Sequence, residues 1–281
     1  MAVTNFLQTI WSKNIQDDLE VKCKLVNNCL RDYEGDCKYA QSVKILGVGE
    51  PTVGTYDSTT DITIEEMSDK GQILTIDQAK YFGFYVDDIN QAQSVPGLKE
   101  KYQEKAVHSL MVARDTYVAG LIKGVTTAAN VTTAANLTED AVKAAIDNGI
   151  VALRERNFDE DGVIEITPAV YNVFKNCLIT LSTNNPEYIK KGIVGMYDGF
   201  EVMMSNNMAK DTSGSTKYAY CDIRGKKAIA FAGQINEVEA LRAEKRFKDI
   251  VRGLDTFGAK VIDEKRIQVI KVPLVYTAPV S

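Results

Sequence analysis

Three glycines, Gly47, Gly49 and Gly54, are the first residues whose spacing could serve chemistry, because glycine-rich loops cradle phosphate groups. A dinucleotide-binding loop needs its third glycine where this chain has Thr52, and a helix must follow, which Pro51 and the β-prone residues after it do not favour. A phosphate-binding P-loop needs Gly-Lys-Ser/Thr, and Gly54 does not begin that motif. The run predicts a glycine-rich bend at the root of a hairpin.

Two groups of acidic residues could bind a cation or move a proton. The stretch Asp159-Glu160-Asp161-Gly162 resembles a fragment of a calcium loop, but the remaining ligands and the distal glutamate are missing. Asp87 and Asp88 could act as an acid and base pair, although such a pair needs a pocket that the sequence does not show. A charged turn and a polar strand end before a helix cap are the simpler predictions.

Nucleophilic catalysis lacks its usual residues. His108 is the only histidine and falls in the middle of a predicted helix beside its apolar stripe, so a packing or surface role is the simpler prediction than a part in a Ser-His-Asp or Cys-His set. The cysteines are odd in number and contain no C-x-x-C pair, which predicts free thiols: Cys23, Cys29, Cys37, Cys177 and Cys221. We therefore expect no enzyme activity, no cofactor and no metal, and a protein whose chemistry is assembly.

Composition limits the class of protein further. The chain has 281 residues, 45% hydrophobic and 25% charged, which is typical of a soluble globular protein with a sizeable core. Its net charge of −5 argues against a high-affinity nucleic-acid surface. No apolar run is long enough to span a membrane, and the first residues lack signal-peptide blocks, so we expect synthesis in a cytosol.

The longest predicted element is one helix from residue 95 to about residue 124. Pro96 follows Ser94, a good capping residue, and apolar residues then recur at three- and four-residue spacing. Charged residues, including Arg114 and Asp115, are expected on the opposite, polar side. At 1.5 Å per residue the helix would be roughly 40 Å long. A helix of this length needs two folded units of the chain packed along it, or a neighbouring molecule.

A compact α/β region is predicted between about residues 137 and 235. Thr138 should cap one helix, and Thr167-Pro168 should begin a second by the cap-then-proline rule. Residues 163–166 and 228–232 are apolar enough to be buried strands. Further strands up to about residue 275 are expected to return and pack on the long helix.

Two segments look unable to bury their own surface. The stretch from residue 55 to 70 is polar and lies between the extended segments 43–46 and 73–76, which predicts a long hairpin projecting from the body. Residues 4–30 predict a helical arm whose apolar residues seek a partner, although an ordinary N-terminal helix on its own domain remains an alternative. A tight turn is predicted at Asp198-Gly199.

Several stretches resemble signatures of one protein family. They are Gly192–Val202 with Ser205-Asn206-Asn207, Lys227–Ala232 followed by Glu239, Arg242 and Phe247–Val261, and, earlier in the chain, Leu74–Phe82 with Val86-Asp87-Asp88. Together, in this order, they resemble the major capsid proteins of tailed bacteriophages with the Hong Kong 97-type fold.

This resemblance implies an α+β architecture in five parts. The parts are an N-arm (1–37), an extended E-loop hairpin (38–80), a P-domain with a spine helix (81–129), an A-domain (130–238) and P-domain return strands with the C-terminus (239–281). Three groups of residues are then expected to matter: Gly54, Tyr56, Asp57, Thr59, Asp61 and Met67 for E-loop assembly, Phe6, Ile10 and Trp11 for N-arm assembly, and Asp198, Gly199 and Phe200 as a structural turn in the A-domain.

The resemblance also implies a function. Such a protein self-assembles, as hexamers and pentamers, into the icosahedral shell that encloses phage double-stranded DNA without sequence-specific binding. A separate scaffolding protein and a portal are the implied partners, and the virion is the implied location after synthesis in the bacterial host cytoplasm. The alternatives are an encapsulin-like protein compartment and a solitary ligand-binding domain.

Overall fold

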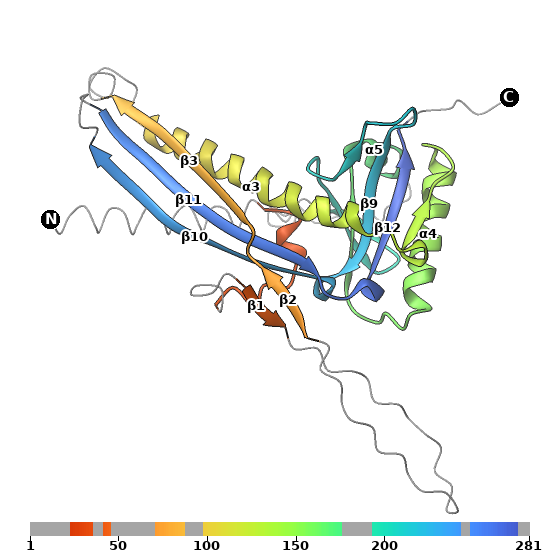
Figure 1. Ribbon diagram of the computed structural model, residues 1–281. Coiled ribbons are helices and arrows are strands. Elements are labelled where there is room, and N and C mark those ends of the chain that lie inside the picture. Colours follow the sequence, from red (N-terminus) through yellow and green to blue (C-terminus); the bar gives the residue numbers. More distant parts are fainter. Residues whose placement is uncertain are drawn as a thin grey trace, which may run out of the picture.

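Two sheets and one long helix form the main part of the molecule (Figure 1). The computed structural model describes residues 23–35, 42–45, 71–87, 98–175, 193–242 and 248–274. The helix, α3 (Leu98–Gly124), runs along the first sheet and ends against the second (Figure 1). The predicted long helix is confirmed over the described residues, and positions 95–97 lie outside them.

The first sheet, called the long sheet here, has three antiparallel strands in the order β10-β11-β3. Its strands are β3 (Gln78–Asp87), β10 (Ile229–Arg242) and β11 (Lys248–Val261). Phe82 and Phe84 of β3 and Val251 and Phe257 of β11 face α3 and join its core. The opposite face of this sheet receives no helix among the described elements (Figure 1).

The second sheet, called the body sheet, has seven strands in the order β4-β12-β9-β5-β7-β6, with β8 beside β9. The strands are β4 (Val131–Thr133), β5 (Gly162–Ile166), β6 (Ile193–Tyr197), β7 (Phe200–Met204), β8 (Lys210–Asp211), β9 (Tyr218–Gly225) and β12 (Ile267–Pro273). Apolar residues fill both faces: one face packs on α4 and α5, and the other shares a core with α3 and the start of the long sheet.

Two helices cover one face of the body sheet, and both begin where the sequence predicts. α4 (Glu139–Arg154) has Thr138 at its N-cap position, although the Thr138 hydroxyl donates to the Asn136 side chain at 2.6 Å and does not cap the helix. α5 (Pro168–Phe174) starts with a proline after Thr167. The Thr167 hydroxyl accepts a hydrogen bond from the Val170 N–H at 3.5 Å, which satisfies one otherwise unpaired donor of the first turn. No described helix is long and apolar enough to cross a membrane.

Short elements complete the described chain. β1 (Ser42–Ile45) and β2 (Gln72–Thr75) pair with each other and pack on β10. Single turns of 3-10 helix lie at η1 (Val26–Asn28), η3 (Ala128–Asn130), η5 (Lys226–Ala228) and η6 (Glu264–Arg266).

The C-terminal part differs from the expectation in two respects. The boundary drawn between residues 238 and 239 falls inside β10, which is one continuous strand. β12 was expected in the return strands of the P-domain, yet it pairs with β9 and β4 in the body sheet. Its side chains alternate, so Ile267 and Val269 face the core of α3, as expected, whereas Ile270 and Val272 face α4 and α5.

The polar side of α3 also differs from the expectation. Arg114 and Asp115, expected among the solvent-facing charges, are buried. Each has polar partners from other elements, described below, and that pairing is why charged side chains are tolerated there.

Candidate functional site

The residues expected to contact other subunits fall outside the described parts of the chain. These are Gly54, Tyr56, Asp57, Thr59, Asp61 and Met67 of the hairpin, and Phe6, Ile10 and Trp11 of the arm. The glycine run from residue 47 to 54 and Asp88 lie outside them as well. What the structure does show is how each of these two segments joins the body.

The hairpin joins the body through β1 and β2. Their antiparallel register sets Ile45 opposite Gln72, so the chain leaves and returns at neighbouring positions. Leu74 is fully buried against Ala230 and Ala232 of β10, whose small side chains allow a close approach. The Gln72 side-chain amide donates to the Ile262 carbonyl at 2.8 Å. The root of the hairpin is therefore part of the folded core.

Gly258 of β11 makes this crossing possible. A Cβ atom built at this position would overlap the carbonyl oxygen of Thr75 and come within 2.9 Å of the Ile76 Cα. Because the atoms in the way are backbone, they cannot move aside as a flexible side chain would. Glycine is therefore required where the β2–β3 connection passes over the long sheet.

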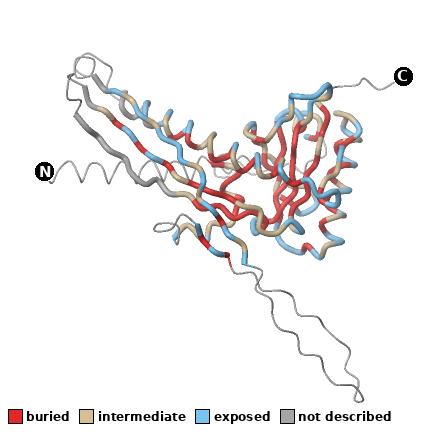
Figure 2. Tube along the Cα trace, viewed as in Figure 1, coloured by how far each residue is buried: buried red, intermediate tan, exposed pale blue. Residues whose placement is uncertain are grey.

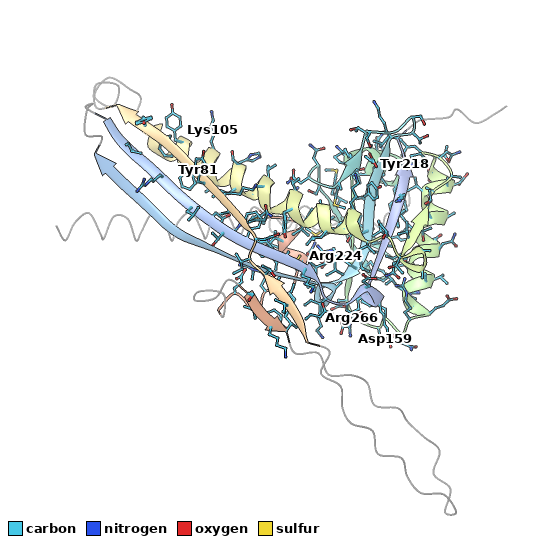
Figure 3. All side chains as sticks on the ribbon, viewed as in Figure 1. Tyr81, Lys105, Asp159, Tyr218, Arg224 and Arg266 are labelled. Atoms are coloured by element: carbon cyan, nitrogen blue, oxygen red, sulfur yellow. The ribbon has the colours of Figure 1, made fainter. Side chains whose placement is uncertain are left out.

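An exposed aromatic face covers the outer part of the long sheet, opposite α3. Tyr81 is 85% exposed, Tyr85 is 66% exposed and Leu254 is 37% exposed. Cross-strand pairing sets Tyr81 opposite Leu254 and Tyr85 opposite Ile250, so these side chains point to one face. Figure 3 shows Tyr81 standing out from β3, and Figure 2 shows exposed residues recurring along that strand.

Sequence reasoning missed this face, although a signal was present. The strand was recognised from its β propensity, but its alternation was not used. Tyr81 and Tyr85 alternate with Phe82 and Phe84, so apolar residues occupy both faces of one strand. That pattern is typical of a strand covered on both sides, and the described parts of the chain cover the side of the phenylalanines and leave Tyr81 and Tyr85 exposed.

The expected turn in the A-domain lies in the β6–β7 hairpin. Asp198 has φ of 48° and Gly199 has φ of 86°, as in the tight two-residue turns that join antiparallel strands. Tyr197 pairs with Phe200, which begins β7 and is buried. An Arg154 guanidinium nitrogen lies 2.9 Å from the Asp198 carboxylate.

A buried ionic cluster lies where the body sheet meets the N-terminal segment. Arg224 of β9, labelled in Figure 3, is fully buried and donates to both oxygens of Glu165 at 2.9 and 3.1 Å through one terminal nitrogen. The same guanidinium donates to the carbonyl oxygens of Leu25 at 2.9 Å and Asn28 at 2.7 Å. Its donors are therefore used to tie residues 25 and 28 to the sheet.

Asp222 adds a second acid to this cluster. It lies opposite Glu165 on the neighbouring strand, and its oxygen is 3.0 Å from the Arg224 Nε without an aligned hydrogen bond. That Nε hydrogen is directed at Glu165 instead. Burial, and then the nearby charge of Glu165, raise the pKa of Asp222 well above its usual value. The shift favours the neutral form of Asp222 over its carboxylate in this cluster.

Asp115 of α3 holds the same segment from the other side. Its carboxylate accepts from the backbone N–H groups of Lys24, Leu25 and Val26 at 3.3, 3.2 and 3.4 Å, and from the side-chain amide of Asn207 at 3.2 Å. Burial raises the pKa of Asp115 to about 6, although these hydrogen bonds oppose the shift.

Arg114, the preceding residue, ties α3 to the long sheet. Its guanidinium forms a two-point contact with Asp255 of β11 at 2.9 and 2.5 Å. It also lies over the rings of Phe231 and Phe257, at 5.6 and 5.9 Å from their centres. Adjacent residues of one helix thus hold two different parts of the molecule. Sequence reasoning missed this because the partners lie about a hundred residues away.

The residues tested for catalysis or metal binding do not form such a site in the described parts. No group of His, Cys, Asp or Glu there could hold a metal ion. Glu160 of the acidic turn lies 3.0 Å from the Lys227 ammonium and 2.6 Å from the Arg266 guanidinium, whose hydrogen bonds lower its pKa. Cys23, Cys29 and Cys221 are free, as predicted, and burial raises the pKa of each thiol, so they stay protonated.

Comparison with known proteins gives the fold a context. No protein-family model and no curated protein sequence matches the chain. Among solved structures, one from Mycobacterium phage Che8 has 24% identity and a TM-score of 0.68, covering 88% of this chain and 90% of its own. The capsid of cyanophage P-SCSP1u has 14% identity and a TM-score of 0.65, with 87% of this chain and 85% of that chain covered.

A bacterial compartment protein is similar as well. The encapsulin of the holo-SrpI complex from Synechococcus elongatus has 10% identity and a TM-score of 0.57, covering 86% of each chain. Sequence identities this low establish shape and not activity. The chain therefore has the fold found in tailed-phage capsid proteins, which encapsulins share.

Proposed function

We propose that this chain is a major capsid protein whose copies assemble into an icosahedral shell around phage double-stranded DNA. The observation that carries the proposal is the structural similarity to phage capsid proteins. The capsid protein of cyanophage P-SCSP1u, for example, matches 87% of this chain, and 85% of its own chain is covered. Because the match extends over most of both chains, rather than over one domain, it supports a shared architectural role. The exposed aromatic face supports the same role, because tyrosine-rich apolar surfaces are typical of protein interfaces.

In this proposal the five expected parts keep their roles, with two refinements. Residues 38–80 form the E-loop, 81–129 the P-domain with α3 as spine and 130–238 the A-domain, and the return strands of 239–281 end with β11, because β12 pairs inside the body sheet. The N-arm, expected over residues 1–37, would be free to reach a neighbour only up to residue 22, because Cys23, Leu25, Val26 and Cys29 are buried in the core.

Assembly would use the long sheet and the hairpin together. The buried root fixes where the hairpin leaves the body, so its residues Gly54, Tyr56, Asp57, Thr59, Asp61 and Met67 would contact an adjacent copy. The face with Tyr81, Tyr85 and Leu254 is the matching surface of the receiving copy. Repetition of this contact would generate the hexamers and pentamers of a closed shell.

Several partners belong to the proposal. A separate scaffolding protein would guide shell closure, and a portal would occupy one vertex. The DNA would be enclosed without sequence-specific contacts, which suits a chain of net charge −5. The protein would be made in the host cytoplasm and end in the virion.

An encapsulin-like compartment is the second candidate, favoured by the encapsulin among the similar structures. Both candidates predict closed shells, so the contents separate them. DNA-packaging components that co-purify with the shells would support the capsid function, whereas a single cargo enzyme would support the compartment.

Negative-stain microscopy of the purified chain, with and without a scaffolding protein, tests the proposal. We expect closed shells or capsomers of uniform size under at least one of these conditions. A protein that stays monomeric at every concentration and salt level tested, with scaffold present, would overturn the proposal and favour a solitary binding domain.

A further inference from the structure

Residues 23–30, called the strap here, connect α3 to β10 through backbone hydrogen bonds. At one end, backbone N–H groups of Leu25 and its neighbours donate to Asp115 of α3. At the other end, the Leu30 N–H donates to the Ile229 carbonyl at 2.8 Å, and the Phe231 N–H donates to the Leu30 carbonyl at 2.9 Å. The strap therefore bridges α3 and β10.

The two ends of the strap bind close to the contact between α3 and the long sheet. Asp115 is next to Arg114, whose guanidinium binds Asp255 of β11. Phe231, which pairs with the strap, carries the ring that lies under the same guanidinium. The strap contacts both α3 and β10, and Arg114 of α3 contacts Phe231 of β10, so each of the three elements contacts the other two.

The body sheet holds the middle of the strap. Arg224 donates to the carbonyls of Leu25 and Asn28, and the Asn28 side chain donates to Glu165 at 2.6 Å. These partners belong to strands buried on both faces and covered by α4 and α5. The strap is therefore fixed to the body sheet, and through its two ends it holds α3 and the start of β10. Figure 1 shows this N-terminal segment near the middle of the molecule, where α3 approaches the body sheet.

We propose that the strap is a positioning element that sets the direction of the long sheet relative to the body sheet. The strap must be seated before Arg114 and Asp255 can hold β11 in one orientation. In the proposed capsid function, on which this consequence rests, a subunit with an unseated strap would present its aromatic face in no fixed direction and would not join a shell.

The position of the strap depends on Asp115, because the strap contacts this carboxylate through its backbone N–H groups. Removing its carboxylate leaves the buried N–H groups of Leu25 and Val26 and the part-buried N–H of Lys24 without an acceptor, and an unsatisfied buried donor is costlier than a lost hydrogen bond. In Asp115→Asn one oxygen can still accept from Leu25 and Val26, but an NH2 group replaces the oxygen that accepts from Lys24 and Asn207, so this variant should preserve the seating only in part.

Hydrogen exchange on the unassembled chain tests the proposal. In Asp115→Ala we expect amides of the strap and of β11 near Asp255 to exchange about tenfold to a hundredfold faster, and α4 amides to stay unchanged. Asp115→Asn should restore part of the protection, to a level between those of Asp115→Ala and wild type. Asp147→Ala is the matched control, because it removes a carboxylate that accepts the Tyr197 hydroxyl at 2.6 Å on α4, away from the strap.

Two results would overturn the proposal. If the strap exchanges faster while β11 keeps its protection, the strap does not position the long sheet. If α4 loses protection as much as β11 does, Asp115 supports only global stability. Should Asp115→Ala not fold, Asn207→Ala gives a milder test, because it removes one donor to the Asp115 carboxylate, at 3.2 Å, together with a weak contact to the Met111 sulfur. It should loosen the same amides less, and unchanged exchange would count against the proposal.

This experiment is independent of shell formation. A wild-type chain that never assembles would contradict the proposed capsid function, and the exchange data would still decide whether the strap positions the long sheet. Conversely, shells formed by Asp115→Ala at wild-type yield would break the link between the strap and assembly.

Discussion

The body sheet and the long sheet of this protein differ in how their faces are covered. The body sheet has α4 and α5 on one face and the core of α3 on the other, so strand β5 is buried along its whole length. The long sheet has α3 on one face; among the described residues β1 and β2 cover the start of the other face at Ala230 and Ala232, and its outer part exposes Tyr81 and Tyr85. A sheet covered on both faces has buried its apolar surface within the chain, whereas an open aromatic face is a surface that another molecule can cover. This difference separates the folding core from the candidate assembly surface.

The largest effect is expected from the ionic cluster inside the body. Arg224→Gln would leave the Glu165 carboxylate buried without its cation, and breaking a buried pair in this way costs about 3–5 kcal/mol. We expect urea unfolding to show a loss of this size, or no folded protein. Arg154→Gln, which removes an exposed pair with Asp198, is the control and should cost less than about 1 kcal/mol. Equal losses of unfolding free energy in the two variants would contradict a stabilising role of the buried ionic cluster.

A pH effect is expected at the joint between the sheets. The pKa of Asp115 is raised from 3.8 to about 6 in the folded chain, so the folded state binds more protons than the unfolded state between these values. Stability from this group is therefore present below about pH 4 and falls as pH rises towards 6, by up to about 3 kcal/mol.

The measurement compares wild type with Asp115→Asn, whose side chain does not ionise. Unfolding free energies between pH 4 and pH 7 should fall for wild type relative to the variant. Parallel curves for the two proteins would show that the carboxylate has an ordinary pKa and that its burial is not maintained in solution.

A smaller effect is expected where the hairpin root crosses the long sheet. Gly258→Ala sets a Cβ against the Thr75 backbone, and overpacking of this kind costs about 1–3 kcal/mol. Gly83→Ala is a matched control in the same sheet, because its Cβ would meet its nearest atoms at 3.9 Å, an ordinary contact. Thermal unfolding should separate the two variants, and exchange at β1 and β2 should rise only in Gly258→Ala. If Gly258→Ala and Gly83→Ala have the same thermal stability, a glycine is not required at position 258, and the prediction is wrong.

Local signals in the sequence predicted most elements but not the contacts between them. The cap residues Thr138 and Thr167 located α4 and α5, and apolar periodicity located α3. By contrast, Arg114 and Asp115 carry the charge typical of a solvent-facing helix side, and nothing near them in the sequence marks their partners. Asp255 and Asn207 lie 141 and 92 residues away. Burial of charge depends on such distant partners, which a periodic pattern cannot show.

The N-terminal segment illustrates the same limit. Its apolar residues favoured an arm that seeks a partner, and for residues 23–30 the partners are within the chain itself. Leu25 is 1% exposed, and its carbonyl oxygen accepts from Arg224, 199 residues later. A short apolar segment looks the same in the sequence whether its partner lies in the same chain or in a neighbour.

The most direct test of the central claim is the double variant Tyr81→Ser/Tyr85→Ser, observed by negative-stain microscopy under conditions where wild type forms shells. Both side chains are largely exposed, so the unfolding free energy of the unassembled chain should change by less than about 0.5 kcal/mol. Val151→Ser, which removes an exposed apolar side chain from α4, is the control and should assemble normally. We predict a folded double variant that forms no closed shells; closed shells at wild-type yield would contradict the assignment of this face to assembly.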